Sequence, residues 1–72
     1  MAATLDLAVS LAHERWRKAV DNLWREVLYA RRARLEERER ERSRRRLKNL
    51  RRIVRKALSE YHRLELERQA KS

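Results

Sequence analysis

The sequence contains neither glycine nor proline in its 72 residues. At average usage near 7% and 5%, a chain of this length would lack both about once in ten thousand draws. Helix interiors exclude both residues, whereas the Ala, Leu, Arg, Glu and Lys that fill this chain favour helices. The composition therefore predicts an all-α fold of nearly continuous helix, and it excludes glycine-rich phosphate-binding loops. A chain idealised by design has the same composition, so an artificial origin is kept as an alternative.

Cysteine is absent as well, which excludes disulfides and thiolate metal sites. A single domain of 72 residues, 44% of them charged, has little apolar surface to bury against its ordering entropy. Association with another chain is the remaining source of stability. We therefore expect residues 1–72 to form one helical domain that self-associates as a homo-oligomer.

Long hydrophobic runs are also missing. The apolar part of the N-terminal segment extends only from Leu5 to Ala12, with no basic residue before it. This stretch is too short for a signal-peptide core or a membrane span. We expect a soluble intracellular protein, cytoplasmic or nuclear, that does not bind membranes.

Positive charge is concentrated in the middle of the chain. Residues 31–56 hold fourteen Lys and Arg against four Glu, and so carry the net charge of +10 of the whole chain. The flanking residues 1–30 and 57–72 each hold equal numbers of basic and acidic groups. This distribution indicates a cationic surface between two amphipathic arms, and hence an anionic partner.

A first amphipathic helix is predicted at about residues 4–38, because apolar residues recur there at steps of three and four. The stripe consists of Leu5, Val9, Ala12, Trp16, Val20, Leu23, Val27 and Ala30, and is widened by Trp24, Leu28 and Leu35. Thr4 is the expected N-cap. Leu7, Leu11 and Tyr29 lie on the opposite side, so we expect the first turns to lie in an interface.

A second amphipathic helix is predicted at about residues 44–70, with the alternating steps of a coiled-coil seam. Its stripe consists of Leu47, Leu50, Val54, Ala57, Tyr61 and Leu64, flanked by Ile53 and Leu58. The opposite face carries Arg44, Arg45, Lys48, Arg51, Arg52, Arg55, Lys56 and Arg63. One helix thus combines an apolar face with a strongly cationic one.

Residues 36–46 contain no apolar side chain, so we expect none of them in a core. In a helical hairpin the chain would turn within residues 39–45, with Ser43 as the second N-cap, and the stripes would face each other. The alternative is one helix of about 68 residues and about 100 Å, whose two stripes would point to opposite sides. The hairpin is preferred, although no glycine or asparagine marks the turn.

In either architecture two chains are expected to meet, with an antiparallel helical bundle dimer as the simplest closure. The apolar surface assigned to self-association comprises Leu5, Val9, Trp16, Val20, Leu23 and Val27 together with Leu47, Leu50, Val54, Ala57 and Tyr61.

Catalysis has little support. Ser10 and His13 share a helical face at i, i+3, but no third group orients the histidine, so we expect no enzyme. His13 and His62 would approach each other in a hairpin, yet neither belongs to a metal-ligand motif. We therefore expect no metal and no cofactor, and interpret both as partly exposed histidines at the edges of the stripes.

The aromatic residues divide into two groups. Trp16, Trp24 and Tyr61 lie on or beside the stripes, so core packing is the preferred interpretation for them. Tyr29 is the one aromatic side chain left free to stack on a nucleic-acid base.

The arginine cluster is the sharpest signal. Residues 43–56 hold eight basic residues and no acid, an arrangement whose repulsion a polyanion would relieve. Arg is favoured over Lys, and its planar fork binds two phosphate oxygens at once. We expect a non-catalytic module that reads the shape and charge of an RNA or DNA duplex backbone. The expected contact residues are Arg44, Arg45, Lys48, Arg51, Arg52, Arg55 and Lys56.

Two alternatives stay open. One is a structural or designed helical bundle with no natural ligand, whose charge is incidental. The other is a basic amphipathic helix that docks in a calmodulin-like groove or on an acidic protein, with anchors such as Leu47, Val54 and Tyr61.

Overall fold

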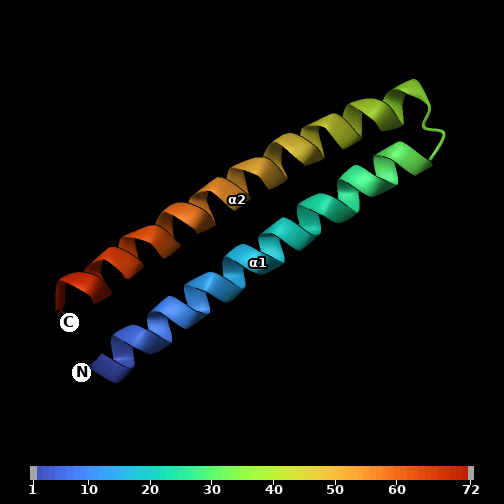
Figure 1. The fold of residues 1–72 in the computed structure, drawn as a ribbon. Coiled ribbons are helices and arrows are strands. Elements are labelled where there is room, and N and C mark those ends of the chain that lie inside the picture. Colours follow the sequence, from blue (N-terminus) through green and yellow to red (C-terminus); the bar gives the residue numbers. More distant parts are fainter. Residues whose placement is uncertain (1, 72) are drawn as a thin grey trace.

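A computed structural model describes residues 2–71 as two helices, α1 (Ala2–Arg32) and α2 (Glu37–Lys71), joined by a short loop. The helices run antiparallel and side by side, so that both ends of the chain lie at the same end of the molecule (Figure 1). The all-α hairpin is therefore confirmed, and the single continuous helix does not form.

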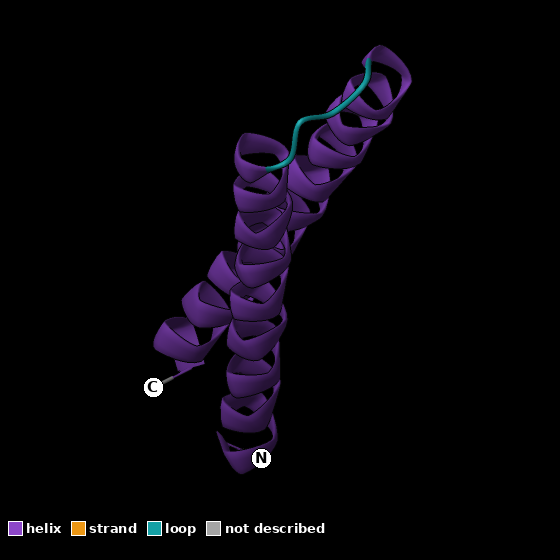
Figure 2. Cartoon of the chain, turned by 90° about the vertical axis from the view of Figure 1, so that its right-hand side faces the viewer, coloured by secondary structure: helices purple, strands orange, loops and turns teal. Residues whose placement is uncertain are grey.

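The molecule is a rod of 53 × 15 × 12 Å with a radius of gyration of 16.3 Å. A compact domain of this length would have a radius of gyration of about 11 Å. Figure 2 shows that the helices cross at an angle, as packed helices usually do. Charged residues recur along both helices, and neither helix contains an apolar stretch long enough to cross a bilayer.

The turn comes earlier than the sequence predicts, at residues 33–36 instead of 39–45. Arg31 and Arg32 lie in the last turn of α1, whereas Glu37 and Glu39 lie in the first turn of α2. Both pairs complement the helix dipoles, since cations favour a C-terminus and anions an N-terminus. The mixed charges of residues 37–42 thus begin a helix instead of forming a loop.

Leu35 and Arg40 close the loop. Leu35, expected on the first helix, lies in the loop and is buried, and its carbonyl accepts a hydrogen bond from Arg40 Nε at 3.0 Å. No residue in the described part of the chain has a positive φ angle. The turn therefore needs no glycine, which removes the main argument against a hairpin.

Neither predicted N-cap is correct. Thr4 lies inside α1, which already includes Ala2, because the alanines before it favour helix. Ser43 lies well inside α2 and is one of the most buried residues of the molecule. The expectation that residues 36–46 contribute nothing to a core is therefore wrong as well.

The seam between the helices is narrow and built from small side chains. Val9, Ala12 and Ala19 are buried, and no large side chain among the described residues is fully buried. All the other apolar residues assigned to self-association are half-buried, so they lie at or beside the contact of α1 with α2. Ala19 is buried at the position of the seam that the sequence analysis gave to Val20. The buried residues of α1 follow alternating steps of three and four, which lead from Trp16 to Ala19.

Three ion pairs cross the seam and report its register. Arg15 pairs with Glu60 at 3.5 Å, and Arg68 pairs with Asp6 at 3.8 Å. Near the other end, Arg46 pairs with the carboxylate of Glu26 on α1 at 3.3 Å. In each pair the two residue numbers add to nearly the same value, as an antiparallel register requires. The exposed pairs contribute only about 0–1 kcal/mol each, so they indicate the register more than they determine it.

Candidate nucleic-acid interface

The seven predicted contact residues are all exposed on α2. Because Leu47, Leu50 and Val54 of the same helix are half-buried in the seam, most of the basic side chains occupy the solvent side of α2. Arg44 lies at its edge, where it lines a recess shared with Ala30 and Ala33. From Arg44 to Lys56 this face extends over about 18 Å at 1.5 Å per residue. We call it the basic face; it consists of Arg44, Arg45, Lys48, Arg51, Arg52, Arg55 and Lys56.

Few groups of the chain itself neutralise the basic face. Arg45 pairs with Glu41 at 3.4 Å, in an exposed contact of little strength. Arg52 donates a hydrogen bond to Asn49 Oδ1 at 3.1 Å. Among residues 2–71 the other five members, Arg44, Lys48, Arg51, Arg55 and Lys56, form no hydrogen bond or ion pair through their side chains. Their donors are available to an external anion.

The centre of the basic face is hollowed. An open recess of about 320 Å³ lies there, lined by Arg45, Lys48, Asn49, Arg52 and Arg55. Four cationic side chains thus surround one surface depression, with only one neutral amide among them. An oxyanion such as a backbone phosphate suits this arrangement, because several N–H donors can reach it together.

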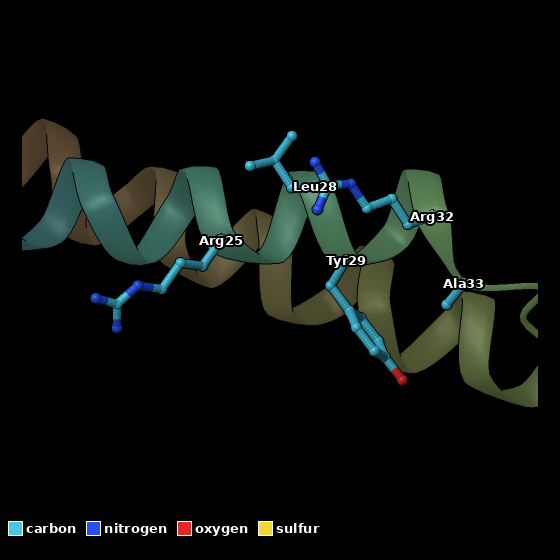
Figure 3. A pocket seen from close by; sticks show the side chains of 5 residues that line it. All are labelled: Arg25, Leu28, Tyr29, Arg32 and Ala33. Atoms are coloured by element: carbon cyan, nitrogen blue, oxygen red, sulfur yellow. The ribbon is translucent and has the colours of Figure 1, made fainter.

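A second open recess, of about 440 Å³, lies at the end of α1 (Figure 3). It is lined by Arg25, Leu28, Tyr29, Arg32 and Ala33. Sequence reasoning identified Tyr29 as a free aromatic residue but did not connect it with the two arginines. Their spacing from Tyr29, four residues before and three after, was the available signal.

A polar contact interrupts the seam between these two surfaces. The Glu26 side chain is only 11% exposed, and it accepts hydrogen bonds from Ser43 Oγ at 3.2 Å and from Arg46 Nη1 at 3.3 Å. Arg46 therefore reaches across to α1, although its own side chain stays 60% exposed. Extending the repeat of α2 by four residues before Leu47 would have placed Ser43 on the seam.

Trp16 and Tyr61 pack with the two histidines as a cluster between the middle of the hairpin and its open end. Trp16 stacks on Tyr61 with ring centroids 6.4 Å apart, and His13 contacts both rings. His62 contacts Tyr61 from the other side at 5.9 Å. The hairpin thus brings both histidines to one tyrosine, but the described residues include no group of three or more potential metal ligands.

Trp24 differs from this cluster. It is 56% exposed, so its assignment to core packing is wrong. A two-helix hairpin covers only one side of α1, and Trp24 lies on the flank that α2 leaves open.

Comparison with models of protein families, with curated proteins and with solved structures found no match to this chain. Any function assigned to the two recesses therefore depends on their own residues.

Proposed function

We propose that this chain is a non-catalytic binding module whose basic face contacts the phosphate backbone of duplex RNA or DNA. The supporting observation is that seven exposed cations lie on one helix, five of them without a partner in the described chain. No acidic residue interrupts them, since residues 42–59 contain none. A helical rod of this kind presents its charges at fixed spacing, so little further ordering is needed on binding.

Readout by shape and charge is favoured over a sequence code. Arg and Lys contact phosphates without regard to sequence, whereas Asn and Gln are typical readers of adenine edges. Asn49 is the only neutral amide on this part of α2, and its Oδ1 already accepts a hydrogen bond from Arg52. We therefore expect similar affinity for duplexes of different sequence.

We further propose that two hairpins associate into an antiparallel four-helix dimer. The single hairpin exposes 6599 Å². A compact monomer of this mass would expose about 4,800 Å², so the excess on one chain is roughly twice the area that one partner buries in a standard protein interface. Trp24, with the half-buried Val20 and Val27 beside it, forms an apolar strip on the open flank of α1. Packing along this strip would leave the basic face of each copy accessible.

The other partner classes have less support. Docking of α2 in a calmodulin-like groove would use Leu47, Val54 and Tyr61 as anchors, but these side chains are half-buried in the hairpin. The hairpin would have to open first. A structural or designed bundle without a ligand remains the alternative, and the titration below separates it from nucleic-acid binding.

The test is a titration of duplex RNA, duplex DNA and a single strand of equal length at several salt concentrations. With about five to seven phosphate contacts per chain, log K against log salt is expected to slope near −4 to −6 on duplex DNA. Reversing Arg51 and Arg52 to Glu should weaken binding to every sequence and flatten this slope.

The matched control replaces Arg17 and Lys18, which are exposed on α1, by Glu. It changes the net charge by the same amount as the replacement of Arg51 and Arg52. If both double variants bind equally weakly, net charge alone determines the affinity and the basic face is not the interface. Absence of binding to all three ligands at about 50 mM salt would reject the nucleic-acid proposal in favour of the structural bundle.

A further inference from the structure

We propose that the recess around Tyr29 binds an unpaired nucleotide, with the base stacked on the tyrosine ring and its phosphates on Arg25 and Arg32. This inference rests on the proposed nucleic-acid function and adds a single-stranded component to it. The ligand would be a duplex with an adjoining unpaired strand, such as an overhang or a bulge.

The recess has the shape and lining for a flat ring. Tyr29 is 53% exposed, and its ring extends from α1 away from Leu28 (Figure 3). Ala33 and, on the other side of α1 from the ring, Leu28 supply the remaining apolar lining of an open hollow of about 440 Å³. Base–aromatic stacking tolerates any base, because each presents a π face.

The charges around Tyr29 favour an anionic ligand. Arg25 and Arg32 are exposed one turn before and one turn after it, and within residues 2–71 neither forms an ion pair. The only acid within one turn of Tyr29 is Glu26. Its carboxylate is turned into the seam, where it is bound by Ser43 and Arg46. The polar groups left at the recess are therefore cationic.

All the residues that line the recess belong to α1 or to the loop that follows it. Glu26 and Tyr29 are three residues apart and share a side of α1, and Arg46 crosses from α2 to reach Glu26. The flank of α1 with Tyr29 therefore faces the edge of α2 that carries Arg46, about 150° around the α2 axis from the middle of the basic face. A strand leaving a duplex on the basic face would pass around α2 to reach Tyr29, and the apolar strip at Trp24 lies about 140° from Tyr29 around the α1 axis.

A second copy of the chain fits the recess less well. It would bring two sets of Arg25 and Arg32 together on a protein with a net charge of +10. Like charges brought together in this way oppose association. The exposed Tyr29 and Leu28 are therefore assigned to a nucleotide and not to the dimer contact.

The experiment compares three ligands: a blunt duplex, the same duplex with a single-stranded extension, and the extension strand alone. Variants are Tyr29→Leu, which removes the ring, and Tyr29→Phe, which keeps it. The wild type and Tyr29→Phe should bind the extended duplex about five-fold to a hundred-fold more tightly than the blunt duplex. Tyr29→Leu should lose this preference and bind the blunt duplex unchanged.

Four results would overturn the inference. If the blunt duplex is bound but the extension adds nothing, or if Tyr29→Leu keeps the preference, the recess does not hold a base and the basic face remains the interface. If Tyr29→Leu converts a dimer into a monomer in sedimentation, a second copy occupies the recess. If the wild type binds none of the three ligands, both this inference and the nucleic-acid proposal fail.

Discussion

Ser43 on α2 donates a hydrogen bond from Oγ to Oε1 of Glu26 on α1, 3.2 Å away across the seam. Ser43 is only 6% exposed. The half-buried Leu47 on α2 and Leu23 on α1 are the next apolar residues along the seam, on the side away from the loop. A polar pair inside an apolar seam has one good register, because a shifted pairing would leave a buried carboxylate without a donor. This contact therefore accounts for the position of the turn at residues 33–36.

Removal of this hydrogen bond should destabilise the hairpin. Ser43→Ala leaves one acceptor of Glu26 unsatisfied, and we expect the free energy of unfolding to fall by about 1 kcal/mol. Chemical denaturation followed by circular dichroism measures it. The control is Ser59→Ala, an exposed serine of the same helix, which should change stability by less than about 0.5 kcal/mol. If the two variants lower the free energy of unfolding equally, the hydrogen bond between Ser43 and Glu26 does not contribute measurably to stability.

Replacing both Glu26 and Ser43 by apolar residues should show that this polar pair contributes to a unique register more than to stability. Glu26→Leu combined with Ser43→Leu removes a desolvated carboxylate and its donor together, and we expect stability equal to or above that of the wild type. The same variant should populate additional registers or oligomers, because the seam becomes uniformly apolar. Sedimentation and the sharpness of NMR amide signals report this loss of uniqueness. A less stable protein with one register would contradict the prediction.

Small side chains at the centre of the seam allow α1 and α2 to approach. Ala12 and Ala19 are buried between the helices, so Ala19→Leu should force them apart and cost about 1–3 kcal/mol. Lys18→Leu adds a leucine to the adjacent exposed position and serves as the control. Thermal melts of the two variants compare them directly. A stable Ala19→Leu protein would mean that the seam has room for a larger side chain.

The proposed dimer depends on the apolar strip at Trp24. Trp24→Lys should give a monomer at micromolar concentration in sedimentation, because a charge would replace the largest apolar side chain of the contact. Leu66→Lys removes an equally exposed apolar residue at the far end of α2 and should leave the dimer intact. A wild-type chain that is itself a compact monomer at this concentration would reject the dimer.

Salt should stabilise the hairpin. The cations of the basic face repel one another in the folded state, and added salt screens this repulsion. We expect a broad melt at modest temperature whose midpoint rises with salt, measured by circular dichroism without any ligand. Reversal of Arg51 and Arg52 to Glu should raise the midpoint at low salt and flatten its salt dependence. A sharp, salt-independent melt at high temperature would instead indicate an idealised bundle.

The sequence by itself determined the elements and the faces of this protein. Helix is favoured by the absence of glycine and proline and by the many Ala, Leu, Arg and Glu residues, and a step of three or four places apolar residues on one side and Arg and Lys on the other. The exposure of the basic face follows from this local periodicity alone, since the apolar side of α2 had to be covered by some partner helix. That Tyr29 points away from the main stripe followed in the same way.

Only the tertiary structure decided where the chain turns and which polar groups are buried. Residues 36–46 are helix-prone in either architecture, so their local preferences do not locate the turn. The hydrogen bond between Ser43 and Glu26 does locate the turn, because it joins residues far apart in sequence. The donor and the acceptor meet in only one register of the two helices. The exposure of Trp24 was decided similarly: two helices can cover only one side of each other, and which flank stays open depends on how they cross.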